Sequence, residues 1–237
     1  MPFPRGALAV RAALAAVLAC GLADAPPARA QVPPSAAELQ AYRGLHAAAA
    51  AGDAARIAAL LREGANPNAR DGHGRTPLHV AAHRGKVDAM RALAAGGADV
   101  NALESDRYDI VTIAAVANDL PTLDAALALG CKATNVTSRY DGTALIAAAH
   151  LGHAEVVRRL VKAGAPLDHV NNLGWTALIE SIVLGDGGAR HTDTLRVLVE
   201  AGANVNLPDR QGTSPLALAR GRGYAAMAGI LERAGAR

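Results

Sequence analysis

The chain has 237 residues, of which 51% are hydrophobic, 3% aromatic and 19% charged, with a net charge of +3. So few aromatic side chains argue against a sandwich or barrel packed with rings, and so high an apolar content excludes a disordered chain. Alanine supplies 58 residues. Because alanine favours helices and lets them approach closely, this composition predicts small, close-packed helices.

Residues 1–30 have the pattern of a secretory signal peptide. Arg5 and Arg11 precede a short apolar run, and Ala28-Arg29-Ala30 offers a small-x-small cleavage site. The apolar run is too short to span a bilayer, which needs about 20 residues, and no later segment predicts a transmembrane helix. An alternative is a lipoprotein signal, because Val17-Leu18-Ala19-Cys20 resembles a lipobox. A lipid anchor at Cys20 therefore stays open, as does an ordinary N-terminal helix.

Removal of residues 1–30 would change both the charge and the cysteine count. Three arginines and one aspartate would leave, which lowers the net charge from +3 to +1. The remaining basic residues are scattered among acids, so the sequence gives no sign of nucleic-acid binding. Cys131 would be the one thiol left, and a single thiol cannot form an internal disulfide. We therefore expect the fold to be stabilised by packing alone.

Two markers recur in step along the rest of the chain. A leucine or valine anchor recurs at intervals of 33, 33, 34, 33 and 38 residues, at Leu45, Leu78, Val111, Leu145, Leu178 and Leu216. A glycine followed by a small residue recurs after each anchor, at Gly64, Gly97, Gly130, Gly164, Gly202 and Gly235. A period of this length is typical of a solenoid, in which stacked units share one continuous core.

The stretch Thr76-Pro77-Leu78-His79-Val80-Ala81-Ala82 carries the T-P-L-H-x-A-A pattern, and the chain resembles the ankyrin-repeat family over residues 36–237. The resemblance implies an all-α solenoid of six stacked repeats, preceded by a linker at residues 31–35, with a five-residue insertion in repeat five. We expect Thr or Ser to cap the first helix of four repeats, at positions 76, 143, 176 and 214. Ser35 and Glu38 fit a capping box that opens the first helix.

The finger loops hold the first candidate contact residues. Side chains three and five positions before each anchor are expected to project at the tips, as for Arg75 and His73. Repeat four has one extra residue, so that its finger reads Arg139-Tyr140-Asp141-Gly142. Tyr108, Tyr140 and Trp175 lie on consecutive fingers, and Tyr, Trp and Arg dominate interface energetics. We predict partner contacts at Tyr108, Arg139, Tyr140, Asp141 and Trp175, although the rings could instead pack on neighbouring fingers.

Further candidates lie where the sequence departs from the repeat. His150 occupies a position five residues after its anchor, which the family exposes on the concave face. Glu180 stands where the other repeats carry Ala, Val, Ile or Leu, and a carboxylate there must be paired. We expect either a structural bond from Glu180 to a finger or to the insertion loop, or a binding-site residue with a raised pKa. The insertion falls within residues 184–192 and brings Asp186 and His191. We expect it to lengthen the turn between the two helices and to close one end of the groove, or to be a harmless surface excursion.

No established catalytic motif is present. The chain has no dinucleotide-binding glycine loop, phosphate-binding loop or nucleophile elbow, and no cysteine pair with zinc spacing. His150 and His153 form an H-x-x-H pair, but an intervening glycine is expected to break the helix. A weak metal or hydrolase alternative would use Asp141, Glu180 and Asp186. The sequence therefore predicts no cofactor, no resident metal and no catalysis.

The resemblance implies a non-enzymatic scaffold that binds another protein through its finger loops and concave face. The signal and the Ala-Arg-Gly-rich composition favour the periplasm of a bacterium, and similar periplasmic ankyrin proteins suggest a supporting role for another enzyme, including under oxidative stress. The alternative is a small-molecule or metal-binding receptor with a pocket around repeats four and five.

Overall fold

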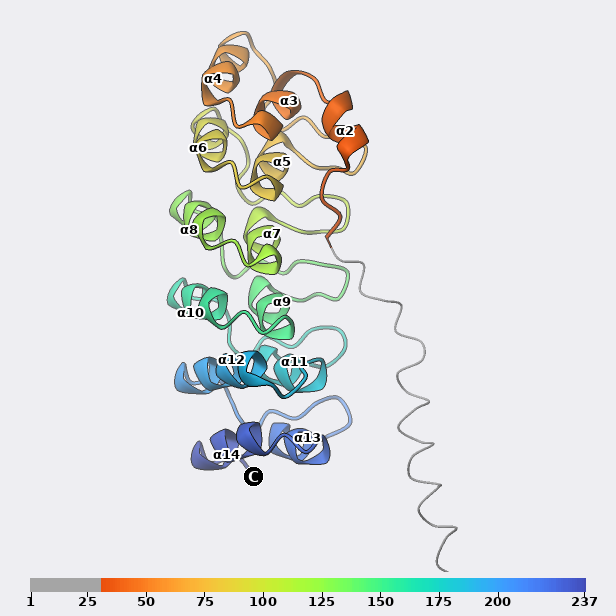
Figure 1. Ribbon diagram of the computed structural model, residues 1–237, viewed down its shortest axis with the longest axis vertical. Helices are drawn as coiled ribbons and strands as arrows, with labels where there is room; N and C mark the ends of the chain where they lie inside the picture. Colours follow the sequence, from red (N-terminus) through yellow and green to blue (C-terminus); the bar gives the residue numbers. More distant parts are fainter. Residues whose placement is uncertain (1–30) are drawn as a thin grey trace, which may run out of the picture. The chain divides into compact units, whose positions relative to one another are not determined.

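Thirteen helices, twelve of them stacked in two columns, form most of residues 31–237, the part of the chain that a computed structural model describes (Figure 1). The predicted signal peptide and Cys20 lie outside the described residues. Residues 31–35 precede the first helix, α2 (Ala36–Ala41), without regular secondary structure. Each repeat then contributes one helix to each column. The all-α solenoid of six repeats is thereby confirmed.

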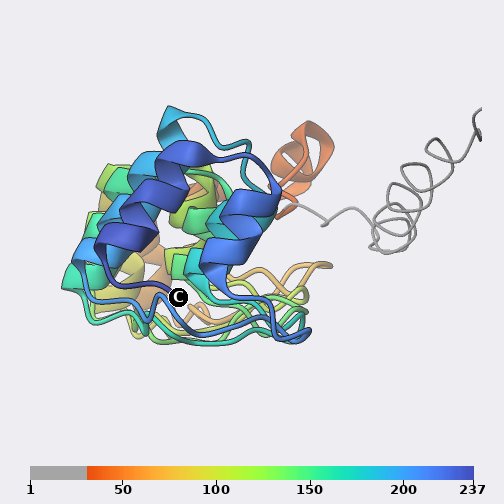
Figure 2. The ribbon, with the colours of Figure 1, turned by 90° about the horizontal axis from the view of Figure 1, so that it is seen from below.

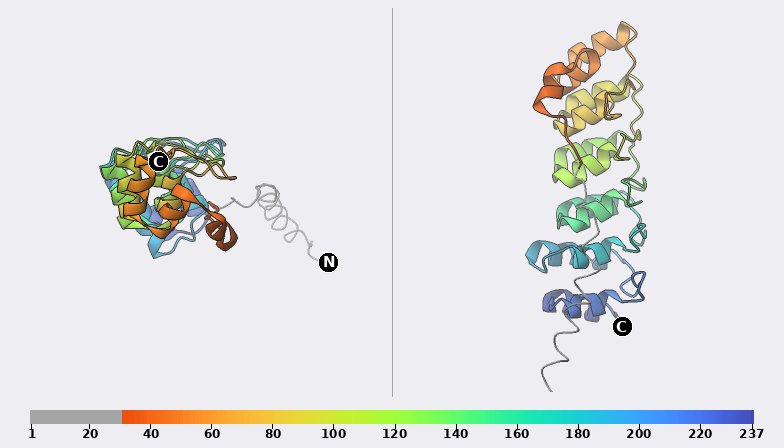
Figure 3. Two further views of the ribbon diagram at one scale, coloured as in Figure 1. Left: turned by 90° about the horizontal axis from the view of Figure 1, so that it is seen from above. Right: turned by 90° about the vertical axis from the view of Figure 1, so that its right-hand side faces the viewer.

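The first helices of the repeats form one column, which we call the inner helices. They are α3 (Gly44–Ala51), α5 (Pro77–His83), α7 (Ile110–Ala117), α9 (Ala144–His150), α11 (Ala177–Val183) and α13 (Pro215–Gly221). The second helices form the outer column: α4 (Ala54–Arg62), α6 (Val87–Ala95), α8 (Leu120–Ala128), α10 (Ala154–Lys162), α12 (Ala189–Glu200) and α14 (Ala225–Arg233). The finger loops extend from the side of the inner column, as the end-on views show (Figures 2 and 3).

Local sequence determines where the helices begin and end. The four predicted hydroxyl caps, Thr76, Thr143, Thr176 and Ser214, each accept a hydrogen bond from a backbone N–H of the first turn. Asp109 does the same for α7. Asn118 ends α7 with a φ of 53°, in the left-handed region where repeats one, two and four use glycine. The four hydroxyl caps are therefore confirmed.

The core runs along the stack between the two columns. Leu45, Leu78, Val111, Leu145, Leu178 and Leu216, the six anchors, are all buried. Each inner helix contacts the inner helices before and after it and the outer helix of its own repeat. The buried set is dominated by Ala, Leu, Val and Ile, which explains how these short helices pack with so few aromatic rings. Of the described helices, none is both long enough and apolar enough to cross a bilayer.

The capping box of Ser35 and Glu38 is present, but the helix that it opens is additional to the six pairs. Helix α2 has no buried residue. It is held by polar contacts to the second finger, because Glu38 pairs with Arg75 and lies 3.2 Å from His73. Tyr42, just after α2, donates a 2.6 Å hydrogen bond to Asp71. This arrangement corrects one prediction: Arg75 does not project from its finger but is 1% exposed.

The insertion in repeat five also differs from expectation. It does not only lengthen the turn between helices, since α12 has 12 residues where α10 has nine. The inserted residues are thus divided between a glycine-rich turn at 185–188 and an extra turn of helix. The turn packs closely against the last repeat, because a Cβ on Gly187 would come within 2.4 Å of the Tyr224 ring. The insertion therefore packs against the last repeat and belongs to the stack.

Cys131 is buried at the end of the third repeat, where its Sγ lies 3.2 Å from the carbonyl oxygen of Val100. Burial raises the pKa of its thiol to about 12. Iodoacetamide reacts with the thiolate, and the raised pKa lowers the thiolate fraction of Cys131 roughly a thousandfold at pH 8. We therefore expect iodoacetamide at pH 8 to leave Cys131 unmodified in the folded protein and to alkylate it fully in guanidinium chloride. Peptide mass spectrometry identifies the site. Equal labelling in both conditions would contradict the burial of this residue.

Candidate functional site

Fingers two to five form a connected row, in which the tips of fingers three, four and five are each bonded to the tip before them. The backbone N–H of Ser105 donates to the carbonyl of His73 at 3.0 Å, that of Ser138 to Arg107 at 3.0 Å, and that of Asn172 to Tyr140 at 2.9 Å. These bonds join fingers two to five main chain to main chain. A surface linked in this way is largely preorganised for binding, since little backbone entropy remains to be lost.

Two crossed ion pairs add side-chain links between fingers three and four. Asp106 pairs with Arg139 at 2.9 Å, and Arg107 pairs with Asp141 at 2.8 Å. All four side chains are at least one-third exposed, so each pair contributes little to stability by itself. Their effect is to hold Arg139 and Asp141, two predicted contact residues, in defined positions at the surface.

The predicted projection of finger side chains holds for one of the two positions. Side chains five residues before the anchor face solvent, as for His73, Leu173 and Gln211. Side chains three residues before it turn inward, where Arg75 is buried and Trp175 is half-buried. Tyr108 and Tyr140 are half-buried as well. Of the three rings, Tyr108 packs against the core, and all three keep part of their surface exposed.

Glu180 is buried beneath the inner-helix face, as its position in α11 predicted. Its Oε1 accepts a 2.9 Å hydrogen bond from the Asn171 side chain of the same repeat's finger. Its Oε2 is buried without a hydrogen-bond partner, and the Nδ1 of His150 lies 3.6 Å away. Burial raises the pKa of the Glu180 carboxyl to about 7, against the hydrogen bond from Asn171, which lowers it. The predicted bond to a finger is thus present, and it satisfies one oxygen only.

The insertion is bonded to the repeat before it through His191. The Nδ1 of His191 lies 2.7 Å from Asp186, and its Nε2 lies 2.9 Å from the carbonyl oxygen of His150. His191 is buried, whereas Asp186 is exposed. The structure thereby brings together four of the predicted residues, His150, Glu180, Asp186 and His191, at the junction of repeats four and five. Burial lowers the pKa of His150, and the neighbouring His191 acts in the same direction.

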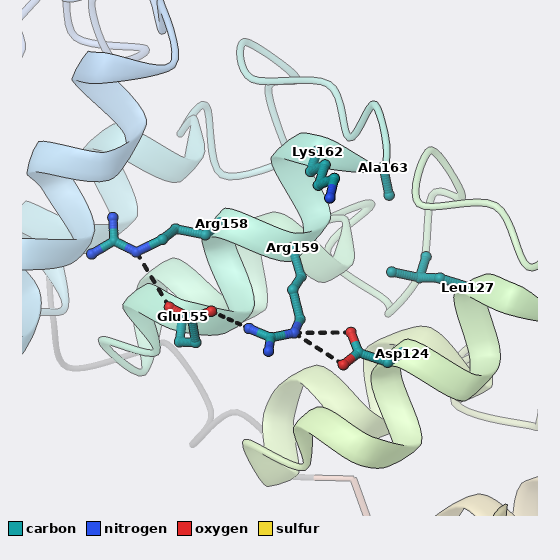
Figure 4. Close-up of a pocket in the computed structure, with 7 residues that line it drawn as sticks. All are labelled: Asp124, Leu127, Glu155, Arg158, Arg159, Lys162 and Ala163. Carbon is teal, nitrogen blue, oxygen red and sulfur yellow. Dashed lines mark hydrogen bonds and ion pairs between the residues drawn. The ribbon is translucent and has the colours of Figure 1, made fainter.

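Metal-binding chemistry finds no support among the residues described. They contain no group of three or more His, Cys, Asp or Glu side chains that could hold an ion. His153 instead uses its Nδ1 on the carbonyl oxygen of Ala115 at 3.0 Å. A surface hollow does occur between α8 and α10, where Arg159 bridges Asp124 and Glu155 (Figure 4). It lies on the outer helices, away from every predicted contact residue, and Arg159 there is already paired.

One residue that the sequence analysis did not single out is Arg222, immediately after α13. Its Nη2 donates a 2.9 Å hydrogen bond to the carbonyl of Val183, while its Nε is buried and has no acceptor. Only its position in the repeat could have pointed to Arg222, because it stands six residues after its anchor, as Arg84 does in repeat two. Only the packing of α13 on α11 shows that its guanidinium is incompletely paired.

Comparison with known proteins agrees with the geometry. A family model described as ankyrin repeats (3 copies) matches residues 45–134 and 111–209. An ankyrin repeat domain from Acinetobacter baumannii AYE is 42% identical, with a TM-score of 0.76 over 81% of this chain and 98% of that one. The ankyrin repeat domain of Bcl-3, a member of the IkappaB family, is 28% identical, with a TM-score of 0.74 over 83% of this chain and 87% of that one.

Among full-length relatives, the ankyrin repeat protein YahD of Escherichia coli (strain K12) is 39% identical over 103 residues, which cover 43% of this chain. The matched part spans about half of that relative, 51% of its length. The ankyrin repeat is a binding module that typically lacks catalytic activity. By its two-helix units, its finger loops and the family model that covers most of its length, the chain belongs to the ankyrin-repeat family.

Proposed function

We propose that this protein is a non-enzymatic scaffold that is exported to the bacterial periplasm and binds another protein there. The observation that supports binding most directly is the row of fingers, joined main chain to main chain and carrying Arg139, Tyr140 and Asp141 at its surface. A rigid surface with aromatic and arginine side chains is suited to a protein partner. The bound partner would be an enzyme that the scaffold protects or helps to assemble, including under oxidative stress.

Crosslinking from a single finger position tests the scaffold function. A photoreactive amino acid replaces Leu173, an exposed residue of finger five, and the protein is expressed in its native host. We expect one partner to be crosslinked from this position. The matched control places the same group at Glu63, an exposed residue beyond the outer helix α4, where no crosslink is expected. Absence of crosslinks from Leu173 would contradict the proposal.

A triple variant tests which residues bind the captured partner. With Tyr140→Ala, Trp175→Ala and Asp186→Ala combined, we expect the affinity to fall at least about tenfold, because interface energy is concentrated in a few such side chains. Circular dichroism checks that the helices remain. The control variant replaces Arg62, Asp88 and Glu200, exposed residues of the outer helices, by Ala. Unchanged affinity of the first variant, with intact helicity, would exclude this patch.

The location is tested by the mature N-terminus. Mass spectrometry of the protein from periplasmic extract is expected to find Gln31 as the first residue. An acylated Cys20 would instead indicate a membrane-anchored lipoprotein, and an uncleaved chain would contradict export.

A further inference from the structure

The exposed part of the inner helices has an unusual charge composition. Glu180 is the single carboxylate within the six described inner helices, and it is buried. By contrast, the set of outer helices contains both acidic residues and arginines, and α10 by itself contains both. The inner-helix face therefore presents cationic and apolar groups but no exposed carboxylate of its own.

An apolar row runs along the middle of this face. It consists of Val116, Leu151, Val183 and Leu184, which lie five or six residues after the anchors of repeats three to five; Ala117 and His150 hold the other two such positions. None of these four side chains is buried, although most inner-helix residues are, and Leu184 is 39% exposed. Exposed apolar side chains on successive inner helices are an expected contact area for a partner.

A cation stands at each end of the row. Arg84, in repeat two, is exposed and has no side-chain hydrogen bond or ion pair to any described residue. Arg222, in repeat six, has one bond to the carbonyl of Val183 and a buried Nε without an acceptor. Neither guanidinium has a carboxylate partner among the described residues, and both keep part of their side chain at the surface, where a carboxylate of a binding partner could pair with them.

The acids that follow the inner helices, and two acids of the fingers, have partners within the chain. Asp53, Asp119 and Asp186 lie two or three residues past the inner helices, and each accepts a hydrogen bond from a backbone N–H of the segment that follows. Asp186 is further bonded to His191. The finger acids Asp106 and Asp141 are paired with arginines. None of these carboxylates forms an ion pair with Arg84 or Arg222.

We propose that the row Val116, Leu151, Val183 and Leu184, with Arg84 and Arg222 at its ends, binds a segment of the partner protein that has aliphatic side chains in its middle and a carboxylate at each end. This inference rests on the proposed scaffold function and specifies the chemistry of the partner. Four repeat steps separate the two arginines, and helices that pack about 8–10 Å apart place them roughly 30 to 40 Å from one another. An extended segment of about 10 to 12 residues spans that length.

Selection from a random peptide library on phage, with segments of about 12 residues and the purified protein as bait, tests this chemistry. We expect the enriched peptides to carry Asp or Glu near both ends and Leu, Ile or Val between them. Binding of a representative peptide is expected to weaken at least about tenfold in the double variant Arg84→Gln, Arg222→Gln. The matched control, Arg62→Gln with Arg91→Gln, removes two charges from outer helices and is expected to leave the affinity unchanged.

Three outcomes would overturn the inference: no enrichment, enrichment of basic or acid-free peptides, or equal binding by the two double variants. Circular dichroism confirms that the arginine variants fold, and Arg84→Gln alone provides a variant that removes no internal contact. If crosslinking from Leu173 still captures a partner in any of these cases, the scaffold function stands and only the chemistry of the partner segment is wrong. Failure of that crosslinking would contradict the scaffold function itself.

Discussion

Replacement of Glu180 by Gln is expected to stabilise the protein by about 3 kcal/mol at pH 8 and to leave its stability nearly unchanged at pH 4. Burial raises the pKa of this carboxyl from 4.5 to about 7, and each unit of pKa corresponds to about 1.4 kcal/mol. Glu180 is protonated in both the folded and the unfolded state below pH 4.5. Its unfolded form ionises first as the pH rises, so stability falls progressively up to about pH 7.

Urea unfolding at pH 4 and pH 8 measures this effect. The amide introduced by Glu180→Gln retains an oxygen for the bond from Asn171 and cannot ionise, so the variant lacks the pH-dependent loss. Glu200→Gln, at an exposed position on α12, serves as the control, and its stability is expected to change by less than about 0.5 kcal/mol at either pH. An equal gain at both pH values would show that the burial of an ionised carboxylate is not the cause.

Arg75→Ala is expected to destabilise the protein by about 3 kcal/mol, because removal of one partner from a buried ion pair leaves the other without compensation. The Arg75 guanidinium donates a 2.8 Å hydrogen bond to Asp71 and also pairs with Glu38. Burial raises the pKa of Asp71, but hydrogen bonds from Tyr42 and Arg75 outweigh it and bring the pKa down to about 2. The pair therefore stabilises the fold above the unfolded pKa of 3.8, and this contribution is lost as the pH falls to about 2.

The same substitution is expected to release α2 before the rest of the stack. Helix α2 buries no residue, so its attachment depends on the contacts of Glu38 and Tyr42. Hydrogen exchange should accelerate at the amides of 36–41 in the variant, while those of α9 and α11 stay protected. Arg91→Ala, which removes an exposed pair with Asp88, is the control, with an expected cost below about 0.5 kcal/mol. A loss of less than about 1 kcal/mol for Arg75→Ala would contradict the buried role of this arginine.

Several site features depend on packing between repeats and could not be predicted from the sequence. Arg75 has the spacing of a finger-tip residue, yet it is buried and pairs with Asp71 of its own finger and with Glu38 of α2, a helix outside the repeat. The sequence identified Glu180 as misplaced in an apolar position and expected a bond to a finger. That one of its oxygens would remain unpaired could be seen only once His150 was placed 3.6 Å away. Arg222 is ordinary in sequence and becomes notable because α13 packs against α11.

What the sequence determined by itself is the repeat: its register, its caps and its left-handed turns. These features arise from spacings of a few residues, such as Thr143 before α9 or Asn118 after α7, so that local geometry is sufficient to predict them. Tertiary structure decided the environment of each charged side chain and the division of the insertion between turn and helix. Hydrogen bonding and desolvation of these groups depend on partners 37 to 39 positions away in the chain, as for Arg75 with Glu38 and Arg222 with Val183. Only the stacking of one repeat on the next brings such partners together.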